Sequence, residues 1–426
     1  MGGTRAPQTV TYPLAEWILR RARRVGPIAF GWLGRPYAYL VGAEANEFLF
    51  AHDDHFNQFE AMKALIPVDG PQSVVVSDPP EHGRRRALVR PGLHHKQVAG
   101  YIDTMARTAA EALATLVPGL PFDGYALFRS AIRRSTMRCL FGERAAAHAD
   151  SVGDALQPLI ELTNLAPQML VAHERWNTAR WRRAMAARAA LDEFVLGEVD
   201  RLATHPDSDD SQVLSLLVHG RDGAGSGLDR GEVRDQVVTL IAAGYETTSA
   251  AMGWTLYGLG GRPDVIAAAR AEVLDVTGGE AVTADHLPRL RWVPAIVNEA
   301  LRLYPPASIS ARYVARDLEF HARRIRTGTT IVYSPYATHR CEPVFEDPLA
   351  FRPERWLDGL KPAPGAFVPF GGGAHRCLGS VLATTELAVM LATTLIHGEF
   401  RLEQQTIRAT GITSMKPRPG VWVRFC

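Results

Sequence analysis

One cysteine stands among residues that could make it a metal-binding thiolate. Cys377 closes a glycine-rich run that leads into a predicted apolar helix, and the run reads Phe367, Val368, Pro369, Phe370, Gly371, Gly372, Gly373, Ala374, His375, Arg376, Cys377, Leu378, Gly379. A helix N-terminus offers unpaired N–H groups and positive potential, and both stabilise a thiolate. The glycines let the backbone turn tightly and approach a flat ligand closely, while Phe370 would cover one side of the sulfur. A cysteine by itself is more often a small buried hydrophobe, so the interpretation depends on the whole run.

Two further segments carry polar residues at unusual places in predicted helices. Gly244, Glu246 and Thr247 lie in the middle of a long helix expected over residues 231–259. Glycine and threonine are poor helix formers, although an ordinary packed helix accepts hydroxyls that bond back to the preceding turn. Glu299 and Arg302 are three residues apart and share one helix face. Such pairs are usually exposed and contribute roughly a few tenths of a kcal/mol.

The spacing Phe–x–x–Gly–x–His–x–Cys–x–Gly closely resembles the haem-binding loop of the cytochrome P-450 family. The resemblance implies that Cys377 is the axial ligand of the iron in haem b. It also implies that Phe370, Gly371 and Gly379 shape the cofactor site. His375 stands where the family more often has arginine, and it would donate to a haem propionate.

Other motifs of the same family follow in the expected order. Glu299 and Arg302, together with Arg355 of the Phe-Arg-Pro-Glu-Arg-Trp run at 351–356, resemble its Glu–x–x–Arg and Pro–Glu–Arg motifs. The resemblance implies that these three residues form a buried ionic cluster that braces the cysteine loop. Because a buried charge needs partners, losing any member should be severe.

The segment in the long central helix resembles the oxygen-activating part of the family. The resemblance implies that Gly244 leaves room for dioxygen, and that Glu246 and Thr247 form an acid–alcohol pair that delivers protons. A thiolate ligand favours O–O cleavage. The expected reaction is therefore insertion of one oxygen atom from O2 into a lipophilic small molecule, by hydroxylation or epoxidation. The stretch 328–336, with Trp356, resembles bacterial members of the family that act on terpenoids or lipids. This resemblance implies terpenoids or other natural products as candidate substrates.

Three residues are expected to hold the haem propionates. His82 and Arg86 are four residues apart, so they share one helix face and could donate to one propionate. Arg312 resembles the family's further propionate-binding arginine, while Arg84 and Arg85 compete with Arg86 for its role. The resemblance also implies which segments line the substrate pocket, and their residues are mostly large and apolar. They are Phe59, Met62, Leu65, Ile66, Val68, Leu162, Leu165, Met169 and Leu170.

Electrons are expected from NAD(P)H through separate redox partners, because the chain shows no appended flavin or ferredoxin domain. An acidic ferredoxin or flavodoxin, with its reductase, would dock near Cys377, guided by Arg376 and by Arg84 or Arg85. The alternatives are a peroxygenase or a non-enzymatic haem-thiolate binding protein of the same fold. Neither alternative would need Glu246 and Thr247.

The elements that must position these residues indicate a mainly α fold with a small β region. A β-hairpin is expected over 28–40, helices over 96–116, 179–202, 231–259, 263–276 and 378–397, and strands near 313–320, 329–333 and 420–425. The resemblance implies a cytochrome P-450 fold, with haem between the long central helix and the cysteine loop. We expect one catalytic domain over 1–426 with a flexible tail over 1–11; a split at the loops 205–210 and 219–228 is the alternative.

Composition excludes some classes of protein. The 47 basic and 45 acidic residues leave a formal net charge of +2, which argues against a nucleic-acid binder. Four scattered cysteines, Cys139, Cys341, Cys377 and Cys426, make no disulfide framework and favour a reducing cytoplasmic location. The first residues lack the apolar run of a signal peptide or membrane anchor.

Overall fold

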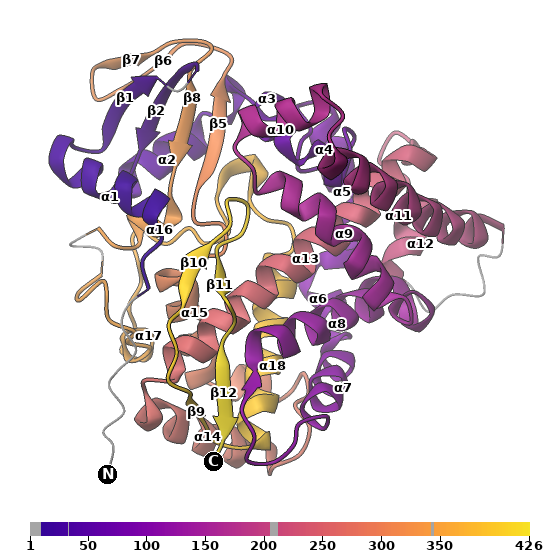
Figure 1. Cartoon of the computed structure of the whole chain (residues 1–426), viewed down its shortest axis with the longest axis vertical. Coiled ribbons are helices and arrows are strands. Elements are labelled where there is room, and N and C mark those ends of the chain that lie inside the picture. Colours follow the sequence, from indigo (N-terminus) through magenta and orange to yellow (C-terminus); the bar gives the residue numbers. More distant parts are fainter. Residues whose placement is uncertain (1–9, 33, 205–211, 342–344) are drawn as a thin grey trace. The chain divides into compact units, whose positions relative to one another are not determined.

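The computed structural model describes residues 10–32, 34–204, 212–341 and 345–426 (Figure 1). Most of the expected N-terminal tail, residues 1–9, and the expected linker at 205–210 lie outside the described residues.

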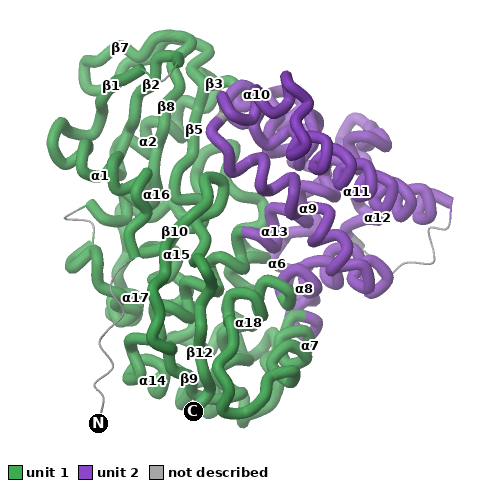
Figure 2. Tube along the Cα trace, in the orientation of Figure 1, with its two compact units in different colours: residues 1–57, 105–131, 247–426 green, residues 58–104, 132–246 purple. Residues whose placement is uncertain are grey.

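The chain folds into two compact units (Figure 2). The first unit comprises residues 1–57, 105–131 and 247–426, and the second comprises residues 58–104 and 132–246. Three helices pass from one unit to the other, namely α7 (Ile102–Leu113), α8 (Gly124–Ala146) and α13 (Arg230–Leu259). The expectation of one catalytic domain stays a prediction.

The first unit holds a five-stranded sheet, in the order β1 (Ile28–Trp32), β2 (Pro36–Leu40), β8 (Thr330–Tyr333), β5 (Ser310–Val314), β3 (Phe56–Asn57). Strands β2 and β8 are parallel, and the other neighbours are antiparallel. The hairpin predicted at 28–40 is confirmed as β1 and β2. Helix α1 (Pro13–Val25) packs Ile18 and Leu19 against one face of this hairpin, while α2 (Ala43–Ala51) packs against the other.

The single strand expected near 313–320 is instead two strands, β5 and β6 (Leu318–Phe320), and β6 pairs with β7 (Arg323–Ile325). The strand is interrupted before β6, at Asp317. The Asp317 carboxylate accepts hydrogen bonds from the N–H and hydroxyl of Thr327 and from Arg324. Small sheets complete the β region, formed by β4 (Phe122–Asp123), β12 (Trp422–Phe425) and β9 (Phe400–Leu402), and by β10 (Arg408–Thr410) and β11 (Lys416–Arg418).

The remaining helices of the first unit are α14 (Pro263–Thr277), α15 (Trp292–Leu303), α16 (Pro335–Thr338), α17 (Glu354–Leu357) and α18 (Ser380–His397), with short 3-10 turns η1 (Asp53–His55), η5 (Leu287–Arg289) and η6 (Gly373–His375). Within the described part of the chain, α18 alone is long and apolar enough to cross a membrane by length and composition. It packs against α14 and α15, and 56% of its residues are buried, as in a core helix of a globular protein.

The second unit is helical. It contains α3 (Gln58–Met62), η2 (Lys63–Leu65), α4 (Ile66–Asp69), α5 (Glu81–Val89), η3 (Arg90–Leu93), α6 (His95–Ala99), α9 (Ala149–Thr163), α10 (Pro167–Arg175), α11 (Ala179–Thr204) and α12 (Gln212–His219). The helices predicted over 179–202, 231–259 and 263–276 agree within two residues with α11, α13 and α14. The helix predicted over 96–116 is two helices, α6 and α7, because the chain turns at Gly100.

Candidate active site

Cys377 lies in a tight turn that leads into α18. Its N–H donates to the Phe370 carbonyl at 3.0 Å, and the Gly371 N–H donates to the Val368 carbonyl at 3.1 Å. The helix begins at Ser380, three residues after the cysteine, rather than at the residue next to it as expected. The Cys377 side chain is exposed just before the N-terminus of the long apolar helix α18.

The glycines of this turn have two roles. Gly371 has φ +65°, which is a left-handed conformation that favours glycine. A Cβ at Gly372 would lie 2.3 Å from the Phe50 ring, and a Cβ at Gly373 would lie 2.2 Å from Asp53 Oδ2. Asp53 also accepts the N–H of Ala374. Close packing against α2 and η1 therefore explains these glycines, in addition to the expected approach to a flat ligand.

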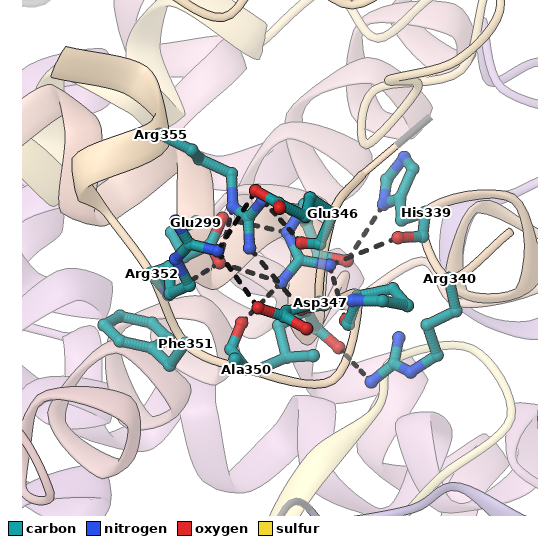
Figure 3. Close-up of polar contacts among 12 residues, drawn as sticks. Glu299, His339, Arg340, Glu346, Asp347, Ala350, Phe351, Arg352 and Arg355 are labelled. Atoms are coloured by element: carbon teal, nitrogen blue, oxygen red, sulfur yellow. Dashed lines mark hydrogen bonds and ion pairs between the residues drawn. The ribbon is translucent and has the colours of Figure 1, made fainter. Parts of the chain in front are cut away.

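Glu299, Arg302 and Arg355 form a buried ionic cluster in the first unit (Figure 3). Arg302 donates from Nε and Nη2 to the two carboxylate oxygens of Glu299, both at 2.8 Å, and Arg355 Nε donates to Glu299 Oε1 at 3.3 Å. Glu299 and Arg302 are 0% exposed. The alternative interpretation of Glu299 and Arg302 as an ordinary exposed ion pair on a helix surface is thus excluded.

The electrostatics of this cluster favour the charged form of its carboxylate. Burial opposes ionisation of Glu299, but hydrogen bonding and charge from Arg302, with the charge of Arg355, outweigh it. The pKa of the carboxyl is therefore held below its ordinary value. The Trp356 Nε1–H and the Arg352 N–H donate to the same carboxylate.

Arg312 is the buried cation of β5. It is 3% exposed, its Nη1 donates to the Ala311 carbonyl at 3.0 Å, and its guanidinium lies over the Tyr333 ring. Its Nε is buried without a hydrogen-bond partner among the described residues. A buried donor left without a partner is unfavourable, so this site fits an added anionic group such as a haem propionate. His375, half-buried in η6, belongs to the same unit.

His82 and Arg86 lie one turn apart on α5 in the second unit. Burial, with the charge of Arg86, lowers the pKa of His82, so a neutral imidazole N–H is the donor available there. Arg86 lines an open hollow of about 250 Å³ together with Gly83, Ala87, Arg90 and Pro91. Arg90, four residues after Arg86 and at the start of η3, borders the same hollow.

Arg84 and Arg85 are not free surface charges, which corrects the expected docking site. Arg84 donates to Glu81 and Glu232, and Arg85 donates from Nε to Glu232 at 2.9 Å and from Nη1 to Ser77 at 2.7 Å. Arg85 is only 8% exposed. Their charges are therefore largely neutralised by nearby carboxylates, whereas Arg376 is exposed as expected.

The central helix α13 carries the predicted acid and alcohol. Glu246 is buried and Thr247 is half-buried. The role expected of Gly244, which is to leave room for dioxygen, stays a prediction, and a Cβ there would lie 3.1 Å from Cγ2 of Thr136 in α8. Glycine at 244 thus permits close packing of two helices. Ala243, the preceding residue, is the exposed small side chain of this stretch.

The expected pocket lining divides into two groups, both within the second unit. Leu162 is 0% exposed, and Val68 and Leu170 are nearly so. These three are core residues, since α4 with Val68 packs on α9 with Leu162, and α10 with Leu170 packs on α11. The others retain exposed surface, and they are Phe59, Met62, Leu65, Ile66, Leu165 and Met169.

The structure thus brings the ionic cluster and the cysteine turn together within the first unit. Arg312, His375 and Thr247 belong to that unit, whereas His82, Arg86, Gly244 and Glu246 belong to the second. Their convergence on one haem stays a prediction.

A sequence model of the family described as Cytochrome P450 matches residues 13–422. The chain belongs to the cytochrome P450 family. Members are haem-thiolate monooxygenases, and this P450 is therefore an enzyme of that class. As in bacterial-type P450s, redox partner proteins are implied.

Curated relatives agree with this assignment. The P450 is 44% identical over 422 residues to a Mycobacterium tuberculosis protein named cytochrome P450 139, covering 97% of this chain and 98% of the relative. It is 32% identical to cyclooctatin synthase of Streptomyces melanosporofaciens, over 81% of this chain and 75% of that protein. It is also 32% identical to pentalenene oxygenase of Streptomyces avermitilis, over 76% and 72%.

A solved structure confirms the predicted fold. The retinoic acid-bound cyanobacterial CYP120A1 superposes with a TM-score of 0.85 at 24% identity, covering 96% of this P450 and 93% of that chain. The likeness extends over nearly the whole of both chains, so the mainly α P450 fold is established here.

Proposed function

We propose that this P450 inserts one oxygen atom from O2 into a lipophilic terpenoid-like molecule, with Cys377 as the haem ligand. The observation that carries the proposal is the exposed Cys377 thiol, placed in a hydrogen-bonded turn just before α18. Positive potential at a helix N-terminus favours the thiolate over the thiol.

The residues of the chain fit a haem. Arg312, with a buried donor that has no partner among the described residues, would bind one propionate, and His375 would assist. His82 and Arg86 would bind propionate from α5, with His82 donating as a neutral imidazole. When bound, thiolate-ligated haem supplies the activation of dioxygen by favouring O–O cleavage.

Glu246 and Thr247 are proposed to move protons. The Glu246 carboxyl would take a proton from solvent and pass it on, and the Thr247 hydroxyl would donate it to the reacting oxygen. Their neighbouring positions in α13 support this role, because one rigid helix fixes the separation of the two groups.

The proposed substrate class rests on the relatives and on the residues of the second unit. Cyclooctatin synthase and pentalenene oxygenase are named for terpenoid products or substrates. The partly exposed Phe59, Met62, Leu65, Ile66 and Leu165 are large and apolar, which suits a molecule with few polar groups. Electrons would come from NAD(P)H through a ferredoxin or flavodoxin and its reductase, in the cytoplasm.

Two measurements test the proposal. The reduced, carbon monoxide-bound protein should show the red-shifted Soret band of thiolate haem, and Cys377→Ala should lose it while Cys139→Ala and Cys341→Ala keep it. Loss of the band in either control, with retention in Cys377→Ala, would refute the ligand assignment.

Turnover of a panel of terpene hydrocarbons and fatty acids should require ferredoxin, ferredoxin reductase and NAD(P)H. Equal turnover supported by hydrogen peroxide alone would favour a peroxygenase. Absence of turnover, with ligand binding still visible as a spin-state change, would favour a haem-thiolate binding protein.

A further inference from the structure

His339 lies between the ionic cluster and the cysteine turn. It follows α16 directly, is 0% exposed, and both of its ring nitrogens are engaged. Nδ1 is 3.0 Å from the Arg302 carbonyl oxygen, and Nε2 is 2.9 Å from the Val368 amide nitrogen. A carbonyl can only accept and an amide N–H can only donate. The proton therefore sits on Nδ1, and Nε2 accepts from Val368.

The imidazole is held neutral, so this pair of bonds persists at ordinary pH. Burial lowers the pKa of His339 to about 3; the hydrogen bond to Arg302 opposes this shift, whereas the charges of Arg302 and Arg340 add to it. A protonated ring would carry hydrogen on both nitrogens and could not accept from Val368. The neutral ring can act as donor and acceptor together.

A short series of hydrogen bonds joins this ring to the cysteine. The Val368 N–H binds His339, the Val368 carbonyl accepts from Gly371, and the neighbouring Phe370 carbonyl accepts from Cys377. On the other side, Arg302 Nη1 donates back to the His339 carbonyl at 3.2 Å (Figure 3 shows His339 beside the cluster). The connection therefore runs through backbone groups whose positions determine the turn itself.

Aromatic packing supports the same connection. The Phe367 ring, one residue before Val368, lies 5.2 Å from the His339 ring and 4.9 Å from the Trp356 ring. Trp356 in turn donates to Glu299. Phe367 is thus held between two residues that are each bonded to the Glu299–Arg302 pair.

We propose that His339 is a positioning residue, which transmits the geometry of the Glu299–Arg302 pair to the turn that presents Cys377 to the haem. The inference rests on the proposed role of Cys377 as ligand. It separates two contributions of the ionic cluster, namely stability of the fold and placement of the sulfur.

Two substitutions at 339 separate the two bonds of the ring. His339→Asn keeps an amide donor near the place of Nδ1, for the Arg302 carbonyl, but has no acceptor that reaches Val368. His339→Gln places its carbonyl oxygen near the position of Nε2, so it can accept from Val368. Leu191→Ala, a truncation of a buried residue of α11 in the second unit, is the control for general destabilisation.

The readouts are amide hydrogen exchange over residues 367–371 and the carbon monoxide Soret spectrum of haem-loaded protein. In His339→Asn, exchange should be about tenfold faster, as expected for one lost hydrogen bond, and part of the haem should lose the thiolate band. His339→Gln should remain close to the native protein. Leu191→Ala should keep native exchange over 367–371.

Native exchange and spectrum in His339→Asn, or equal changes in all three variants, would overturn the proposal. If His339→Asn does not accumulate, hydrogen exchange of the native protein still tests the proposal. The Val368 amide should then exchange as slowly as the buried amides of 299–302. Fast exchange at Val368 would overturn the proposal. A native protein without the thiolate band would refute Cys377 as ligand. A native band together with an unaffected Asn variant would refute only the role of His339.

Discussion

Arg85 of α5 donates from Nε to Oε1 of Glu232, in the first turn of α13, at 2.9 Å. Glu232 is 3% exposed and also receives Arg84. Its Oε2 accepts the Asp229 N–H, while Asp229 Oδ1 accepts the Glu232 N–H, which is a reciprocal capping arrangement at the helix N-terminus. One carboxylate therefore caps the central helix and fixes the helix that carries His82 and Arg86.

Glu232→Ala should destabilise the protein by about 3–5 kcal/mol, because it leaves Arg85 buried without its carboxylate and removes the cap. Urea unfolding at neutral pH measures the change. Glu60→Ala, which breaks the exposed pair of Glu60 with Lys63, is the control and should change stability by less than about 1 kcal/mol. Equal effects of the two substitutions would contradict the structural role of Glu232.

Arg376→Glu should slow reduction of the haem by an acidic ferredoxin, and the native rate should fall as ionic strength rises. The exposed guanidinium adjoins the proposed ligand, so charge reversal opposes docking of an acidic partner. Stopped-flow reduction measures the rate, with the exposed Arg20→Glu in α1 as control. A rate independent of salt and unchanged in Arg376→Glu would refute this docking site.

Glu299→Ala should yield little soluble haem-loaded protein, because Arg302 and Arg355 lose the carboxylate that balances them. Breaking a buried pair of this kind costs about 3–5 kcal/mol. The ratio of haem absorbance to protein absorbance after purification measures the effect. A stable variant fully loaded with haem would show that the cluster is dispensable.

Thr247→Ala should still bind haem and substrate, but a larger share of the dioxygen that it reduces should leave as hydrogen peroxide. Removing the hydroxyl interrupts the proposed proton path, and the measured quantity is product formed per NAD(P)H consumed. Thr255→Ala is a matched control in the same helix, since the Thr255 hydroxyl donates to the Ala251 carbonyl. A native ratio in Thr247→Ala would remove this residue from the mechanism.

Titration of the Asp69 carboxyl, in the second unit, should lower the free energy of unfolding as pH rises toward neutrality. Burial, with the charge of Asp235, raises the pKa of Asp69 from 3.8 to about 7, against a hydrogen bond from Thr239 and the charges of Arg234 and Arg188. Between these pH values the folded state holds a proton that the unfolded state has released. Stability therefore falls as pH rises from about 4 to about 7, by at most about 4 kcal/mol.

The measurement is the difference in unfolding free energy between the native protein and Asp69→Asn at several pH values. Asparagine does not titrate, so this difference should decline over that interval. A difference independent of pH would mean that Asp69 has an ordinary pKa in the folded protein.

The sequence by itself determined those features that depend on short spacings. The cysteine run, the Glu299–Arg302 spacing and the long central helix are local patterns, since helix periodicity and turn residues act over a few positions. Helical periodicity and the short apolar runs at 28–40 predicted a mainly α fold with a β-hairpin, and the resemblance of the motifs implied the family fold. The structure and the comparison with CYP120A1 confirm both. The roles of the proposed site residues stay predictions.

The tertiary structure decided which distant segments meet. Arg85 meets Glu232 across 147 positions, and His339 meets Val368 across 29. The place of Gly244 against Thr136 also depends on how α13 packs on α8. A sequence shows that Arg85 is charged and His339 can titrate, but burial and the choice of partner depend on chain segments brought together by folding. That is why Arg85 is a buried structural cation, and why His339 is a neutral connector beside the cysteine turn.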